Sequence, residues 1–73
     1  MEIVDEIFLL GERIKEADRL ARGYEREGRE LMMCGAPAAE IDLRRKIADD
    51  IRVKISAWQR CEAALKQAGS RED

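Results

Sequence analysis

The chain has 73 residues, of which 41% are charged, 45% apolar and only 4% aromatic, with a formal net charge of −2. A chain this short forms one small domain at most, and its composition favours long helices over a β-fold. Its 14 basic and 16 acidic residues are interspersed, so no basic patch supports nucleic-acid binding or attachment to a membrane surface.

The first half of the sequence has apolar or small residues at every third or fourth position, which is the pattern of a helix with one apolar stripe. We expect this helix over residues 2–33, with the charge pairs Glu12–Lys15 and Asp18–Arg22 on its other faces. Gly11 leaves open whether the helix is continuous. The expected stripe consists of Ile3, Ile7, Leu10, Ile14, Ala17, Ala21, Tyr24, Gly28 and Leu31.

Residues 34–37, with the sequence CGAP, separate the two halves. Gly35 suits the left-handed conformation that ends many helices, and Pro37 suits the first turn of a following helix. Glu40 and Asp42 come next, where carboxylates favour a helix N-terminus. We therefore expect a tight connector between two antiparallel helices.

The second half resumes the helical spacing, and we expect a helix over residues 38–68. Gly69 is the predicted stop, and residues 69–73 are expected to form a frayed tail. One gap of six residues interrupts the stripe near its start. Its expected members are Ile41, Ile47, Ile51, Ile55, Trp58, Cys61, Leu65 and Ala68.

We therefore expect residues 1–73 to form a single all-α domain, an antiparallel two-helix hairpin. Folding at the connector pairs Ala21 with Ile51 and Ala17 with Ile55, so that large residues face small ones. The expected hairpin core consists of Ile7, Leu10, Ile14, Ala17, Ala21, Tyr24, Ile47, Ile51, Ile55 and Trp58.

The stripes do not account for all the apolar residues. A contiguous apolar surface on a small protein usually marks an interaction site, and methionine suits an adaptable contact surface. We therefore expect the hairpin to complete its core on a partner or by dimerisation. The predicted partner-binding residues are Phe8, Leu9, Met32, Met33, Val53 and Ala57.

Groups for catalysis or metal binding are scarce. There is no histidine, and Cys34 and Cys61 would lie roughly 35 Å apart along a helix, too far for a disulfide or a shared metal ion. We expect Cys61 to be buried in the stripe, and we expect no catalytic, cofactor or metal site. The N-terminal apolar run is short with acidic flanks, so we predict neither a secretory signal nor membrane insertion, and we expect a cytoplasmic protein.

The segment ELMMCGAPAAEIDLRR, with a charged helix before it and a longer apolar helix after it, resembles the small co-chaperones of the type III secretion needle subunit (the YscE/PscE type). The resemblance covers residues 25–66 and rests on size, architecture and the turn. It implies a bacterial cytoplasmic protein that binds and stabilises a helical-repeat chaperone, and through it the needle subunit. The longer first helix and Pro37 depart from the family pattern.

Two functions are therefore expected, neither of them enzymatic. The first is a module that binds another protein, with the secretion co-chaperone as its most specific form. The alternative is a homodimeric four-helix bundle that acts as a regulator or adaptor, because two hairpins with coiled-coil spacing could bury each other's stripes.

Overall fold

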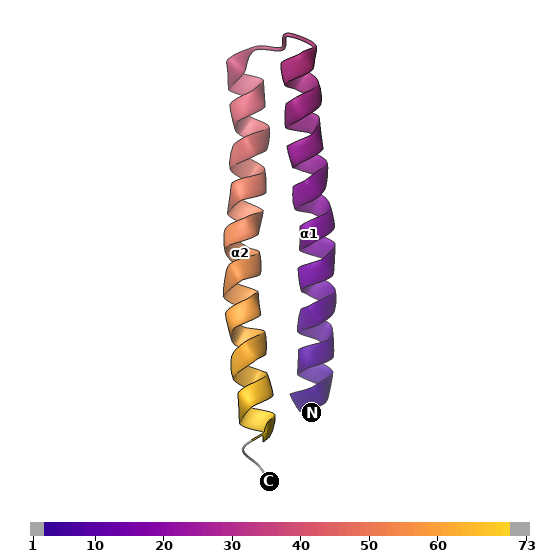
Figure 1. Cartoon of the computed structure of the whole chain (residues 1–73), viewed down its shortest axis with the longest axis vertical. Coiled ribbons are helices and arrows are strands. Elements are labelled where there is room, and N and C mark those ends of the chain that lie inside the picture. The colour runs from indigo at the N-terminus through magenta and orange to yellow at the C-terminus, as the bar shows by residue number, and fades with distance from the viewer. Residues whose placement is uncertain (1–2, 71–73) are drawn as a thin grey trace.

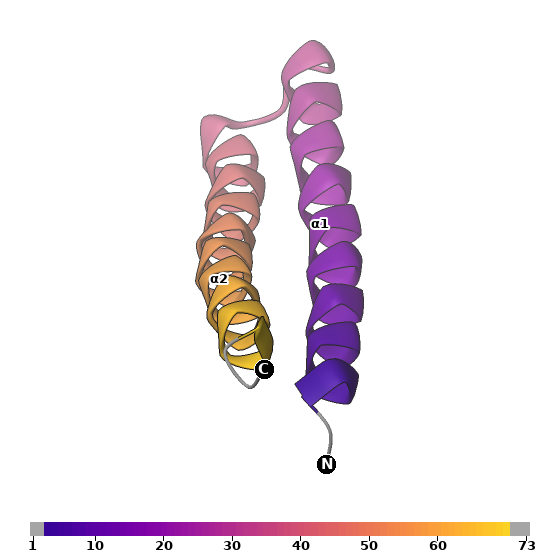
Figure 2. The same ribbon diagram turned by 60° about the horizontal axis from the view of Figure 1, so that its bottom comes forward.

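The computed structural model describes residues 3–70, which form two long helices, α1 (Ile3–Met33) and α2 (Ala38–Ser70). The helices lie side by side and antiparallel, with the start of α1 and the end of α2 at the same end of the molecule (Figure 1). Figure 2 shows the same pairing from a second direction. The predicted all-α hairpin is confirmed.

The helix boundaries differ from the prediction only at the C-terminal side. α2 continues through Gly69 and Ser70 instead of ending at residue 68. A glycine favours a helix end where it takes a left-handed conformation, and within residues 3–70 only Gly35 has a positive φ. Residue 2 of the predicted first helix and residues 71–73 of the predicted tail lie outside the described range.

α1 runs through Gly11 without a break, so the first helix is continuous. A Cβ atom at Gly11 would lie 3.6 Å from Oε2 of Glu62, which shows that this side of α1 faces α2.

The charge pairs predicted along α1 are both present. Glu12 pairs with Lys15 at 3.8 Å and Asp18 pairs with Arg22 at 3.0 Å.

The connector is a Schellman turn. Gly35 has a φ of 76°, its amide donates to the carbonyl of Met32 (3.2 Å), and the Ala36 amide donates to the carbonyl of Leu31 (2.9 Å). The Pro37 carbonyl accepts hydrogen bonds from two amides in the first turn of α2. Pro37 thus precedes the helix instead of occupying its first turn, and the predicted tight connector is confirmed.

The helices meet most closely at small residues. The buried apolar side chains are Ala17, Ala21, Ala48 and Ile55, and Ala21 and Ala48 are only 0% and 1% exposed. The sequence stripe omitted Ala48 because the larger Ile47 stands next to it. Ala48 fills the predicted gap of six, since positions 41, 44, 48, 51 and 55 repeat every three or four residues.

The other predicted core residues are only half-buried, because each is covered by one neighbouring helix. The expected burial of Cys61 is wrong: its side chain is exposed, and position 62 faces α1 in its place. The half-buried members of the predicted core are Ile7, Leu10, Ile14, Tyr24, Ile47, Ile51 and Trp58.

The resulting molecule is long and thin, with extents of 58 × 15 × 14 Å. No large side chain within the described range is fully buried. Much of the apolar surface of this hairpin therefore remains exposed to water. Large apolar side chains contribute most to stability when they are fully removed from water.

Candidate interaction surface

One long edge of the hairpin is closed by charged side chains. The guanidinium of Arg52 in α2 donates to both carboxylate oxygens of Glu25 in α1, from Nε (3.3 Å) and from Nη2 (3.0 Å). Its Nη1 donates to Oδ1 of Asp18 at 2.5 Å, and Oδ2 of Asp18 accepts from Nε of Arg22 at 3.0 Å. We call these four residues the charged edge.

The electrostatics follow from this geometry. The hydrogen bond from Arg52 holds the pKa of Glu25 below its usual 4.5, and the two carboxylates raise the pKa of Arg52 above its ordinary value. Glu25 is therefore an ionised partner of a permanent cation. A two-oxygen contact of this kind fixes orientation more than it adds net stability at a partly exposed site.

The sequence reasoning missed this network. A signal was present, because Asp18 and Glu25 are seven residues apart and so lie two turns apart on one side of α1. Folding the hairpin at the connector brings Arg52 opposite the interval between them. Glu25 therefore binds an arginine of the other helix, across the hairpin.

The opposite edge of α1 carries leucines. Leu9, Leu20 and Leu31 are spaced by eleven residues, or about three turns, so they share one face of the helix. Around the helix axis this face lies on one side of Ala21, whereas Asp18 and Glu25 lie on the other side. Leu9 and Leu20 are 53% and 50% exposed.

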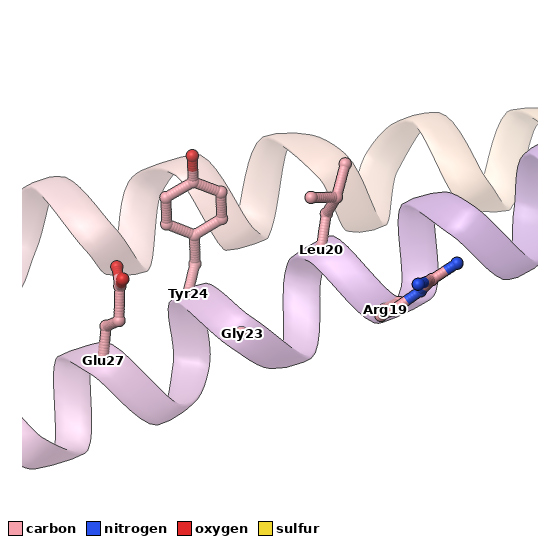
Figure 3. A pocket seen from close by; sticks show the side chains of 5 residues that line it. All are labelled: Arg19, Leu20, Gly23, Tyr24 and Glu27. Atoms are coloured by element: carbon pink, nitrogen blue, oxygen red, sulfur yellow. The ribbon is translucent and has the colours of Figure 1, made fainter.

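Leu20 lies in an open surface pocket. The pocket is lined by Arg19, Leu20, Gly23, Tyr24 and Glu27. Figure 3 shows the side chains of Leu20, Tyr24 and Glu27 projecting from the same side of α1, while Arg19 turns away from them. The pocket walls are therefore apolar at Leu20 and Tyr24, with Arg19 and Glu27 as the charged residues of the lining.

α2 contributes to the same edge. Arg52 and Trp58 stand three residues on either side of the buried Ile55, so they lie on opposite sides of the helix, and Trp58 faces away from the charged edge. Leu65 lines a pocket together with Leu9, which joins the two helices along this side. We call the following residues the apolar edge: Leu9, Leu20 and Leu31 of α1 with Leu43, Ile47, Trp58 and Leu65 of α2.

The predicted partner-binding residues do not share one face. Leu9 lies on the apolar edge, but Phe8, Met33 and Val53 each stand two residues from an inward-facing position and therefore point outward, away from the other helix. Met32 is exposed beside the turn, and Ala57 is only partly exposed. Their role in binding stays a prediction, and apart from Leu9 they would form contacts separate from the apolar edge.

Little else in the described range offers a site. Among residues 3–70, no group of three histidine, cysteine, aspartate or glutamate residues is placed to hold a metal ion. Cys34 and Cys61 are both exposed free thiols. Neither α1 nor α2, over the residues described, has a segment long and apolar enough to cross a membrane.

The comparisons with known proteins add no family. The chain matches no protein-family model, and neither a curated protein nor a solved structure is significantly similar to it.

Proposed function

We propose that this protein is a non-enzymatic protein-interaction module whose apolar edge binds a helical surface of another protein chain. The observation that carries the proposal is the asymmetry of the hairpin. One edge is closed by Arg52 and its carboxylates, while the other leaves leucine, isoleucine and tryptophan side chains along most of its length without a neighbouring element. A surface of this kind usually marks an interaction site.

The shape of the edge favours a helical partner. Two parallel ridges of side chains, one from each helix, border the seam between α1 and α2. A third helix, or a pair of helices, can lay its own ridge along that seam, as in three- and four-helix bundles. Binding would cover Trp58 and Ile47 from the side that α1 leaves open, and it would stabilise the hairpin by mass action.

The sequence resemblance supports a finer proposal. In that form the protein works in the bacterial cytoplasm and also binds a helical-repeat chaperone of a type III secretion needle subunit, through contacts outside the apolar edge. The chain length, the two-helix architecture and the glycine turn agree with it. Phe8, Met32, Met33, Val53 and Ala57 are then candidate secondary contacts, outside the apolar edge.

The proposal can be tested with a photo-crosslinking amino acid placed at Leu20 in the full chain within its native cell. Lys15 is the matched control, because it is exposed on the same helix but lies on the side of the charged edge. We expect a discrete crosslinked protein species from position 20 and none from position 15. Equal crosslinking from both positions, or none from position 20, would overturn the proposal.

A further inference from the structure

Resting on the proposed function, we propose that the occupant of the apolar edge is a second copy of this chain, related by a two-fold axis that passes near Leu20 and perpendicular to the helices. In this arrangement α1 packs antiparallel against the α1 helix of the second copy, and α2 packs against its α2. The two hairpins then form a four-helix bundle in which every neighbouring pair of helices is antiparallel.

The leucine spacing is symmetric about this axis. Leu9 and Leu31 stand eleven residues before and after Leu20. A two-fold axis at Leu20 therefore places Leu20 against Leu20 of the second copy and Leu9 against its Leu31. Like apolar side chains meet at all three levels, over about six turns of α1.

The charges beside the leucines are complementary under the same symmetry. Arg13 lines the pocket of Leu9, and Glu27 lines the pockets of both Leu20 and Leu31. Arg13 and Glu27 stand seven residues on either side of Leu20, so each Arg13 faces the Glu27 of the second copy. Within the described part of the chain, Arg13 has no ion-pair partner, and Glu27 reaches only Arg44, at 3.8 Å.

α2 fits the same axis independently. The contacts between α1 and α2, such as Arg52 with Asp18, place the middle of α2 near residue 52 at the level of Leu20. Symmetry about that level brings Asp50 opposite Lys54 of the second copy. Both side chains are exposed, and neither is ion-paired within residues 3–70. The same register brings Ile47 close to Trp58 of the second copy.

The other two-fold arrangement is disfavoured. An axis parallel to the helices would pack α1 against α2 of the second copy and would place Leu20 opposite Asp50 and Lys54. Leucine against two charges leaves those charges desolvated without partners.

The size of the face also fits a dimer. The edge is about 58 Å long and 14–15 Å wide, and the area given by these two dimensions is close to the ~800 Å² per partner that stable interfaces bury.

A charge-reversal cycle tests the pairing. We expect Arg13→Glu and Glu27→Arg each to raise the dimer dissociation constant roughly tenfold, because each change places like charges at both symmetric contacts. The double variant should return to within about threefold of the original value. The two positions are about 21 Å apart along one helix, so they cannot couple within one chain. Simple additivity of the two effects would overturn the arrangement.

A disulfide trap tests the register in a background with Cys34→Ser and Cys61→Ser. Leu20→Cys should link two copies under mild oxidation. Leu9→Cys should fail alone, because the two copies of position 9 would lie about 33 Å apart, but should link when mixed with Leu31→Cys. Efficient linkage of Leu9→Cys with itself, or no linkage of Leu20→Cys, would overturn the proposal.

The crosslinking at Leu20 separates this inference from the function on which it rests. A product with twice the chain mass supports the second copy. A product with a different protein, together with a single-chain mass for the purified protein, would overturn self-pairing while the interaction module stands.

Discussion

Arg52 donates from Nε and Nη2 to both carboxylate oxygens of Glu25, a residue of the opposite helix that lies 27 positions earlier in the chain. Because Nη1 also binds Asp18, one guanidinium connects α2 to two residues of α1 that lie two turns apart. Sliding α2 by one residue along α1 would break these contacts together. We therefore assign Arg52 the role of holding the register of the hairpin.

The contribution of this contact should depend on pH. The pKa of Glu25 is lower in the folded chain than its usual 4.5, so the unfolded chain binds the proton more readily. The stabilisation is present above pH 4.5 and is lost as the pH falls through the lower folded-state pKa. We expect the urea midpoint to fall between pH 7 and about pH 3 by less in Arg52→Gln than in the unmodified chain.

Arg60→Gln is the matched control for that comparison, because Arg60 is exposed on the same helix and has no ion pair within residues 3–70. It removes the same charge and should leave the acid sensitivity unchanged. An equal reduction of acid sensitivity in both variants would show that net charge, and not the Glu25 contact, is responsible.

The closest approach of the helices depends on Ala21, which is completely buried. Ala21→Leu adds three carbon atoms at a position with no free space and should lower the free energy of unfolding by about 1–3 kcal/mol. Ala63→Leu, at an exposed position of α2, should change it by less than about 0.5 kcal/mol. Chemical denaturation at one fixed protein concentration measures both, and equal effects would contradict the assigned core.

The two glycines Gly35 and Gly23 should respond in opposite directions to alanine. Gly35 has a φ of 76°, where a Cβ atom is strained, so Gly35→Ala should destabilise the protein by about 1–2 kcal/mol. Gly23 is helical and a Cβ atom there would meet nothing within 4 Å, so Gly23→Ala should stabilise the protein by about 1 kcal/mol. Thermal unfolding followed by circular dichroism gives the sign of each change.

Much of this architecture was predictable because it depends on local signals. The spacing of small and apolar residues through Ala17 and Ala21 predicted α1, and Gly35 predicted the turn. These features are determined by residues close together in the chain. The antiparallel pairing then follows from the short connector.

The rotation of α2 about its own axis was not predictable in the same way. The stripe through Ile47 and the stripe through Ala48 overlap on one helix, and the larger residue gave the stronger signal. The structure buries Ala48 because α1 presents small residues there and the backbones approach closely. Ile47 and Trp58 are thereby left half-covered on the apolar edge, a consequence that appears only once both helices are placed.

The charged edge was missed for a related reason. An ion pair within one helix can be predicted from a spacing of three or four residues alone. The contact of Arg52 with Glu25 can be predicted only when the register between the two helices is known. The predicted contact residues Phe8, Met33 and Val53 were selected as apolar residues that the two stripes leave over, and their outward directions follow from the helical rotation.

The most direct measurement is the solution mass of the purified protein by light scattering over a wide concentration range, with circular dichroism on the same samples. For the unmodified chain we expect twice the 8.4 kDa chain mass and strong helicity. For Leu20→Asp we expect a single-chain mass and reduced thermal stability, because the carboxylate would be desolvated at the two-fold axis. A fully helical single chain at every concentration, with Leu20→Asp indistinguishable from it, would contradict the claim that the apolar edge is covered by a second copy.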